Sequence, residues 1–190
     1  MKKEIYQIQV SLIGSKPKIW RRLIVPSNMP LPDLHKVIQT SMGWENAHAH
    51  QFIFENKFYT QPSKDDPMWD DNKNVDYKKV RVHDLLKAEK DQMIYEYDFG
   101  DSWNHSIVLE KILPQDQTLK HPVCIAGKLR CPPEDSGGIH RYSMLLEQLK
   151  DPKGEGYEDA AYWLGTEYDP EYFDKEEINA LLRSRNFGCY

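Results

Sequence analysis

The order of hydrophobic and polar positions predicts two strands and a helix at the start of the chain. Residues 6–12 alternate apolar with polar side chains, which is the period-two pattern of a half-buried strand. Turn residues at 14–17 separate this strand from a second one over 18–25. Apolar residues then recur at helical spacing from 31 to 42, and Gly43 is a natural stop. We expect a ββα start whose helix packs across a sheet, as in α+β folds.

Strand patterns return after this helix. Residues 48–54 predict a third strand, and four of its side chains share one face: His48, His50, Phe52 and Phe54. His35, inside the helix, is interpreted as a surface or boundary residue. The stretch 61–79 contains two prolines, five aspartates and four lysines, so we interpret it as a polar surface loop.

A stretch over 94–105 gathers aromatic, acidic and histidine side chains around a Gly100-Asp101 turn. A two-residue turn at this point predicts a β-hairpin in which Glu96 faces His105, whereas a three-residue loop would shift the register. The facing pair could orient a metal ligand or act as acid and base. It could equally be a cross-strand ion pair beside a core tryptophan.

The C-terminal part of the chain is predicted to be helical. Apolar stripes at helical spacing recur over 140–185, and we expect these helices to cover the sheet. No internal repeat divides the chain. Since 190 residues is the length of one ordinary domain, we interpret 1–190 as a single domain.

Composition narrows the classes of partner. The net charge is −5, so no overall basic field attracts phosphate backbones, which argues against unassisted nucleic-acid binding. No apolar run approaches the ~18 residues of a membrane span, and the first residues lack the apolar core of a signal peptide. Three cysteines are an odd number, which argues against a closed disulfide framework. We expect a cytoplasmic protein without a membrane partner.

Five side chains are candidate metal ligands, with zinc as the candidate metal: His48, His50, His105, Cys124 and Cys131. A metal site could also draw on Asp98, with Glu134 or Asp135 nearby. Two histidines two residues apart on a strand can reach one ion, or can be polar residues at the mouth of an aromatic core. The spacing of the two cysteines is wider than in zinc ribbons, so alone it is a weak signal. Three protein ligands plus water would suit hydrolysis, and four would be structural.

A second set of side chains is a candidate for binding a protein or small molecule of unknown identity: Arg22, Trp44, Glu96, Asp98, Asp101, Trp103, Glu134 and Asp135. Arg21 and Arg22 must point to opposite faces of a strand, so one could bind an anion or lie over an aromatic ring. The Pro- and Gly-rich loop over 121–138 is dense in Cys, Glu and Asp, and such loops often carry function. An exposed aromatic or charged groove is expected near Trp44, Tyr97 and Trp103.

The combined motifs resemble one known family. In chain order they are Ile19-Trp20-Arg21-Arg22, Met42-Gly43-Trp44, His48-Ala49-His50-Gln51-Phe52, Tyr95-x-Tyr97-Asp98-Phe99-Gly100-Asp101-Ser102-Trp103-x-His105, Cys131-Pro132-Pro133-Glu134-Asp135-x-Gly137-Gly138 and Asp169-Pro170-Glu171-x-Phe173-Asp174. This resembles the plasmid pRiA ORF-three-like family of prokaryotic proteins over nearly the whole chain. The resemblance implies an α+β domain with a mixed, mainly antiparallel sheet covered by helices, starting as a β-grasp-like ββαβ unit. Several members have cysteine where this chain has Ser136, which weakens an all-cysteine metal site.

Three functions stay open at this point. The family has no established activity, and the chain has no complete catalytic signature, which favours a non-enzymatic binding or adaptor domain. A metal-binding protein, structural or hydrolytic, is the second alternative. Some family members carry resolvase-like labels, but a DNA-acting protein should show a basic footprint that this sequence lacks. Whether the protein is an enzyme is left undecided.

Overall fold

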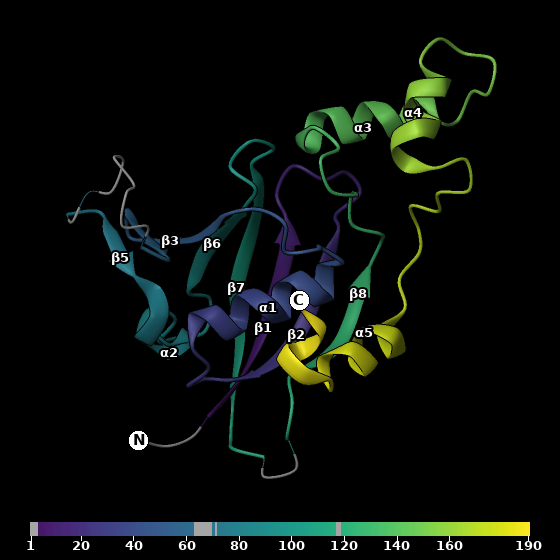
Figure 1. Ribbon diagram of the computed structural model, residues 1–190. Helices are drawn as coiled ribbons and strands as arrows, with labels where there is room; N and C mark the ends of the chain where they lie inside the picture. The colour runs from purple at the N-terminus through teal and green to yellow at the C-terminus, as the bar shows by residue number, and fades with distance from the viewer. Residues whose placement is uncertain (1–3, 63–69, 71, 117–118) are drawn as a thin grey trace.

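A computed structural model describes residues 4–62, 70, 72–116 and 119–190, and within them eight strands form one sheet (Figure 1). In sheet order the strands are β5 (Asn74–Asp76), β4 (Lys57–Thr60), β3 (His50–Phe54), β6 (Gln92–Tyr97), β7 (Trp103–Leu113), β1 (Ile5–Leu12), β2 (Trp20–Pro26) and β8 (Val123–Lys128). Neighbouring strands are antiparallel except β4 and β5, which are parallel. The sheet is therefore mixed and mainly antiparallel, as predicted.

Helices interrupt and follow these strands. They are α1 (Leu31–Met42), α2 (Val82–Leu85), α3 (Gly138–Gln148), α4 (Tyr157–Leu164) and α5 (Lys175–Leu182), with 3-10 turns at Tyr77–Lys79 and Arg185–Gly188. The α+β class and the ββαβ order of the first elements are confirmed. In the part of the chain that is described, no helix combines the length and apolar character needed to traverse a bilayer.

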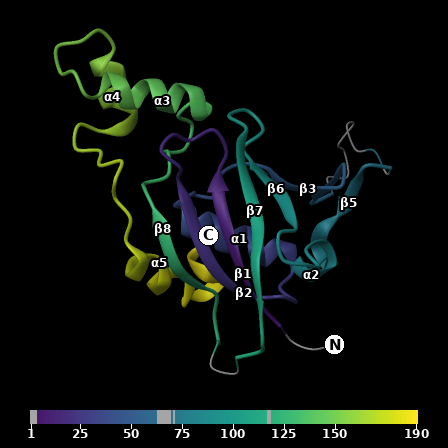
Figure 2. The same ribbon diagram turned by 180° about the vertical axis from the view of Figure 1, so that it is seen from behind.

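The sheet has one covered and one open face. Helices α1 and α5 lie against the same face, and the view from behind shows the other face bare (Figures 1 and 2). Adjacent arginines illustrate the difference. Arg21 is 3% exposed and donates to Ser41 O at 2.7 Å beneath the covering layer. Arg22 points to the open face and pairs with Glu110 at 2.6 Å. The two side chains thus occupy opposite faces, as the strand pattern requires.

The register of the β6–β7 hairpin corrects one prediction. Tyr97 pairs with Trp103, so the loop has five residues, 98–102, in place of two. Asp98 and Ser102 adopt left-handed backbone conformations, with φ of 57° and 52°, and these extend the turn. Because a one-residue shift moves a side chain to the other face, His105 lies buried while Glu96 lies on the open face. The predicted Glu96–His105 pair is wrong.

The stretch 61–79 is only in part a surface loop. Residues 63–69 and 71 lie outside the described part of the chain, but strand β5 pairs with β4 and Tyr77 is buried at 5% exposure. Tyr77 packs its ring 6.4 Å from that of Phe52. The interpretation of 74–79 as solvated loop is therefore wrong, because 74–76 form a strand and Tyr77 joins the hydrophobic core, which a polar composition hides.

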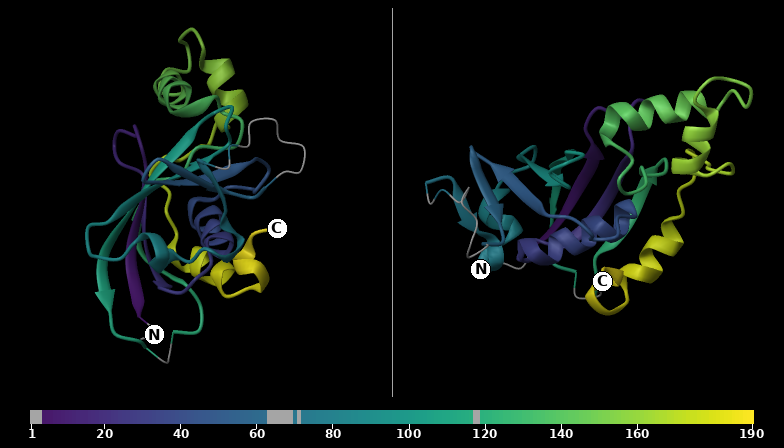
Figure 3. Two further views of the ribbon diagram at one scale, coloured as in Figure 1. Left: turned by 90° about the vertical axis from the view of Figure 1, so that its left-hand side faces the viewer. Right: turned by 45° about the horizontal axis from the view of Figure 1, so that its top comes forward.

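Helices α3 and α4 also depart from expectation. They pack on each other beyond one end of the sheet, where they form an arm, and only α5 joins α1 over the sheet (Figures 1 and 3). Arg141 of α3 stacks over Trp163 of α4 at 4.6 Å, and its guanidinium lies 3.4 Å from Asp159. The predicted helical cover over 140–185 is thus divided between an arm and a true covering helix.

Candidate functional site

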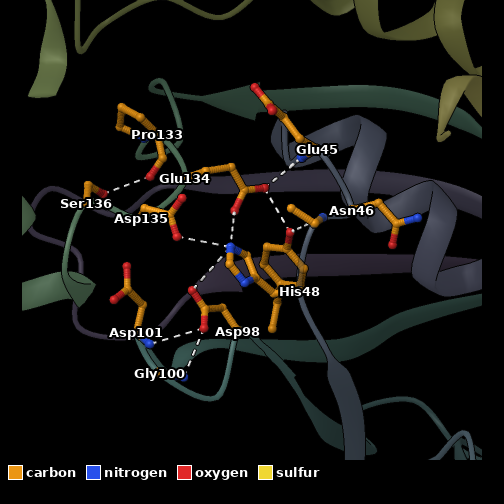
Figure 4. A network of polar contacts seen from close by, with 12 residues as sticks. Glu45, Asn46, His48, Asp98, Gly100, Asp101, Pro133, Glu134, Asp135 and Ser136 are labelled. Atoms are coloured by element: carbon orange, nitrogen blue, oxygen red, sulfur yellow. Dashed lines mark hydrogen bonds and ion pairs between the residues drawn. The ribbon is translucent and has the colours of Figure 1, made fainter.

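Three loops meet at one end of the sheet (Figure 4). They are residues 43–49 between α1 and β3, residues 98–102 of the hairpin, and residues 129–137 between β8 and α3. The amide of Asp98 donates to Ala49 O at 2.9 Å, and the amide of Gly137 donates to Asp101 Oδ2 at 2.8 Å. These bonds fix the hairpin loop between the other two.

Glycine is required where the second and third loops touch. Gly138 has φ of 78°, and a Cβ there would stand 2.7 Å from the carbonyl oxygen of Asp101. The turn before it is closed by Ser136, which is buried and donates to Pro133 O at 2.8 Å. The Gly-Gly pair of the sequence motif therefore allows close backbone approach at this corner.

His48 stands at the centre of an acidic cluster. Its Nε2 atom lies 3.1 Å from Asp135 Oδ1, 3.7 Å from Glu134 Oε2 and 3.8 Å from Asp98 Oδ2 (Figure 4). Each of the three loops contributes to it. Among the described residues, one group of three or more His, Cys, Asp or Glu ligand atoms lies within 4.8 Å of each other: His48, Asp98 and Asp135.

Hydrogen bonds from neighbouring groups hold the Glu134 and Asp98 carboxylates in place beside His48. Glu134 Oε1 accepts from Glu45 N–H at 2.7 Å and from the Tyr97 hydroxyl at 2.8 Å. Asp98 Oδ1 accepts from Gly100 N–H at 2.9 Å. In both residues, one oxygen is fixed by these donors and the other faces His48.

Two of the atoms that face each other in this cluster lack hydrogen-bond partners. Glu134 Oε2 and His48 Nε2 are buried and neither makes a hydrogen bond. Burial raises the pKa of the Glu134 carboxyl, although bonds from Glu45 and Tyr97 oppose the shift. Three acids surround one imidazole, and the side chain of Asp98 is 10% exposed. Mutual repulsion in such a site is relieved by bound positive charge.

His105 lies away from this cluster. It is fully buried, its Nε2 accepts from the Trp44 indole N–H at 3.3 Å, and its Nδ1 lies 3.3 Å from Tyr95 O. The carbonyl and the indole together require a neutral ring with its hydrogen on Nδ1. Burial lowers the pKa of His105 to about 4. Since both ring nitrogens are hydrogen-bonded within the protein, His105 has a structural role.

His50 also lies away from His48. Strand β3 begins at His50, so His48 belongs to the loop before the strand and the two do not share a strand face. Its ring stacks on that of His35 at 3.5 Å, and its Nε2 lies 3.0 Å from the Tyr77 hydroxyl. The expectation that His35 is a surface or boundary residue is wrong, since it is 4% exposed. Burial lowers the pKa of His35 to about 4 and that of His50 to about 3. His35 therefore belongs to the core, and His50 is half-buried beside it.

The tautomer of His35 follows from its neighbours. Asn46 Oδ1 can only accept, so His35 Nε2–H donates to it at 2.8 Å. In the neutral ring Nδ1 is then an acceptor, so the Tyr95 hydroxyl, which accepts from Gln39 at 2.8 Å, donates to His35 Nδ1 at 2.8 Å. This series of hydrogen bonds anchors the loop that carries His48 to helix α1.

The two candidate cysteines are buried thiols that do not join the cluster. Burial raises the pKa of Cys131 to about 12 and also raises the pKa of Cys124. A metal ligand must be a thiolate, which these surroundings disfavour. Cys124 instead uses its backbone, which exchanges two 2.8 Å hydrogen bonds with the Asn179 side chain and so holds α5 on β8.

The residues predicted to bind a partner are scattered. Asp98, Glu134 and Asp135 reach the His48 cluster, and Asp101 braces it through Gly137. Arg22 and Glu96 lie on the open face, where Glu96 accepts from Gln51 at 2.6 Å. Trp44 and Trp103 are core residues whose rings lie 5.3 Å apart.

The groove expected near Trp44, Tyr97 and Trp103 has no exposed aromatic wall, and the charged groups beside these rings are those of the His48 cluster. Trp44 is 6% exposed, and both Tyr97 and Trp103 are fully buried. Their rings fill the space under the three loops, because the observed register turns Tyr97 and Trp103 inward together. Sequence reasoning missed the part of the Tyr97 hydroxyl in holding Glu134, and no local pattern signals a contact across 37 residues.

Comparison with known proteins agrees with the fold. The sequence profile of a family described as plasmid pRiA4b ORF-3-like protein matches residues 4–177. Uncharacterized protein y4hQ of Sinorhizobium fredii (strain NBRC 101917 / NGR234) is 33% identical over 183 residues, which cover 94% of this chain and 90% of that protein. The crystal structure of MM3350, a protein of unknown function from Methanosarcina mazei Go1, is 39% identical with a TM-score of 0.81, covering 93% of this chain and 98% of that one. Neither description states an activity. These matches confirm the resemblance seen in the motifs, and the chain belongs to the plasmid pRiA4b ORF-3-like protein family.

Proposed function

We propose that this protein binds a divalent metal ion through His48, Asp98 and Asp135, with Glu134 as a fourth ligand or as a base beside the ion. The observation that carries the proposal is the surroundings of His48 Nε2. Three carboxylate oxygens stand 3.1–3.8 Å from this buried nitrogen, yet none is hydrogen-bonded to it.

The spacing fits shared coordination. Ligand atoms that bind one ion at about 2.1 Å stand about 3.0–3.4 Å apart in octahedral or tetrahedral geometry. The three distances from His48 Nε2 lie at or slightly above these values. The ligand atoms of His48, Asp98 and Asp135 all lie within 4.8 Å of one another, so these residues would move inward to share an ion. The Asp135 side chain is 65% exposed and can make that movement, whereas Asp98 and Glu134 are already held by backbone and tyrosine donors.

The donor set indicates which metals to test. One imidazole nitrogen with carboxylate oxygens suits zinc and manganese, whereas soft thiolate sites are absent from this cluster. Two or three negative charges would balance a divalent ion. Because the cluster faces solvent on the Asp135 side, a bound ion would keep a water ligand, and zinc would lower the pKa of that water.

Calorimetric titration of chelator-treated, untagged protein with zinc and with manganese tests the proposal. We expect one ion per chain, and at least about tenfold weaker binding in His48→Gln and in Asp98→Asn. His121→Gln is the matched control, because His121 is exposed and precedes β8. Thermal unfolding of each variant separates loss of a ligand from loss of fold. Absence of binding, or equal affinity in wild type and His48→Gln, would contradict the site.

A further inference from the structure

A second site lies under the arm, apart from the His48 cluster. A cleft of about 390 Å³ opens between α3, the turn that joins β1 to β2, and the segment 166–171. Figure 1 shows α3 lying over that turn, with the chain after α4 descending beside it. The cleft has the size of a small-molecule site and lies between two parts of the fold, where such sites are common.

The walls of the cleft are apolar. Ile19 and Leu129 come from the body, while Ile139 and Leu146 come from α3. The hydroxyls of two lining tyrosines are satisfied within the protein: the Tyr168 hydroxyl donates to Cys131 O at 3.1 Å, so the Tyr142 hydroxyl donates to Tyr168 at 2.9 Å. A ligand would therefore gain contact with aliphatic and aromatic surface and would not need to hydrogen-bond these hydroxyls.

The rim of the cleft carries five charged side chains: Lys16, Arg130, Lys150, Glu147 and Glu171. Lys150 and Glu147 neutralise each other at 2.6 Å. Neither Lys16 nor Arg130 forms an ion pair with any described residue, so two cations face one remaining acid, Glu171. In a chain of net charge −5, this rim is locally cationic.

Arg130 is fixed in a position that suits an anion. Its guanidinium lies over the rings of Tyr168 and Tyr172, at 5.1 and 5.2 Å from their centroids. Its amide donates to Pro170 O at 2.9 Å, which holds the backbone at the cleft mouth. Stacking orients the planar group without neutralising it, so its N–H donors stay available for a carboxylate or another oxyanion.

We propose that this cleft binds an amphipathic organic anion, with its apolar body between α3 and the β1–β2 turn and its anionic group at Arg130 and Lys16. Charge complementarity and the apolar walls together select this class over neutral apolar molecules and over cations. The site shares no residue with the His48 cluster, so it stands independently of the proposed metal.

Two fluorescent probes test the proposal in the full-length protein with EDTA present. Anilinonaphthalene sulfonate is an apolar aromatic anion, and N-phenylnaphthylamine is its uncharged analogue. We expect saturable binding of one sulfonate probe per chain, tighter than binding of the uncharged probe, and competition by decanoate but not by decylamine. Equal affinity for the two probes, or more than one equivalent site, would overturn the proposal.

Variants locate the binding. The double variant Lys16→Gln/Arg130→Gln should weaken binding of the sulfonate probe about threefold to tenfold, as loss of two partly exposed ion pairs would do. It should leave binding of the uncharged probe unchanged. The control is Lys78→Gln/Arg185→Gln, which removes the same charge at exposed positions outside the cleft. Leu146→Trp should fill the cleft and weaken both probes. Unchanged sulfonate affinity in the first double variant, with wild-type thermal stability, would refute the proposed anion site even if Leu146→Trp failed to fold.

Discussion

At the scale of single residues, Tyr97 shows how one hydroxyl joins two of the loops at the His48 cluster. It accepts from Ala47 N–H at 2.9 Å and donates to Glu134 Oε1 at 2.8 Å. The phenol is desolvated and lies beside the Glu134 carboxylate, and both effects raise its pKa, so it is a lasting hydrogen donor. The loop that precedes β3 and the loop that follows β8 are thereby linked through a strand residue.

Replacing this residue by Tyr97→Phe should therefore cost about 1–3 kcal/mol of stability, because the Ala47 amide loses its acceptor and Glu134 loses a donor. It should also weaken metal binding, since Glu134 would be free to turn from His48. Urea unfolding and metal titration measure the two effects. Tyr162→Phe is the control, because Tyr162 is 82% exposed. If both variants unfolded at the same urea concentration, the role given to this hydroxyl would be wrong.

Buried neutral histidines give a second prediction at this scale. The pKa values of His105 and His35 fall from 6.5 to about 4, mainly through burial. Between pH 6.5 and 4 the unfolded chain binds these protons and the folded chain does not, so stability falls as pH is lowered through that window. The pKa of His50 also falls, to about 3, so the raised pKa of Glu134 acts in the opposite sense as one group against three histidines.

Urea midpoints measured from pH 7.5 to pH 5 should therefore decline, with most of the change below pH 6.5. His105→Gln should reduce that decline even though it lowers stability at pH 7.5, since a glutamine does not titrate. A midpoint that stays constant from pH 7.5 to pH 5 would mean that these rings do not stay neutral in the folded protein.

At the scale of elements, sequence patterns predicted the elements that depend on local spacing. They failed where contacts between distant residues determine the structure. The ββα start follows from periodicity within short windows, and Gly43 ends α1 with φ of 92° as a stop signal should. The hairpin register failed because Asp98 takes a left-handed conformation that lengthens the loop, and neither Gly100 nor Asp101 signals that choice.

The candidate site was predicted in the same partial way. The sequence predicts a metal site that includes His48 and Asp98 with Glu134 or Asp135 nearby, but it also includes His50, His105 and the two cysteines, which lie elsewhere. Their convergence depends on three loops that are far apart in the chain. The stripe of α3 indicated an apolar face but not what it covers, so the arm and its cleft could not be foreseen.

The corner between the hairpin and α3 allows a matched test at this scale. Gly138→Ala places a Cβ 2.7 Å from Asp101 O at a φ of 78°, so the hairpin loop and the Asp135 loop must separate. Gly165→Ala has a similar φ of 89° but nothing within 4 Å, so it reports backbone strain alone. Strain at either position should cost about 1–3 kcal/mol. Only Gly138→Ala should also weaken metal binding, and equal metal affinity in the two variants would contradict the described corner.

At the scale of the whole molecule, the sheet and the arm differ in how they are held. Strands β1 and β7 form the centre of the sheet beneath α1. Their side chains Ile8, Val10 and Ile107 are fully buried. The arm contacts the body at few points, among them Ile139 against Gly14 and Tyr142 against Tyr168. Its outer surface exposes Met144 at 49% and Tyr162 at 82%. The arm buries Tyr142, Leu145, Ala160 and Leu164 but fewer side chains than the sheet. Segments with less burial open locally at lower free energy than the core.

Hydrogen exchange followed by mass spectrometry should therefore show peptides from α3 and α4 exchanging before those from β1 and β7. Decanoate should slow exchange in α3 if it fills the cleft, whereas zinc should slow exchange in residues 98–102 and 131–137, which carry the acidic cluster. The two ligands thus mark different segments, because α3 begins where the acidic loop ends but presents its apolar face to the cleft. Exchange of the arm at the same rate as β1 would mean that arm and sheet unfold as one unit, and the cleft would then be a fixed part of the core.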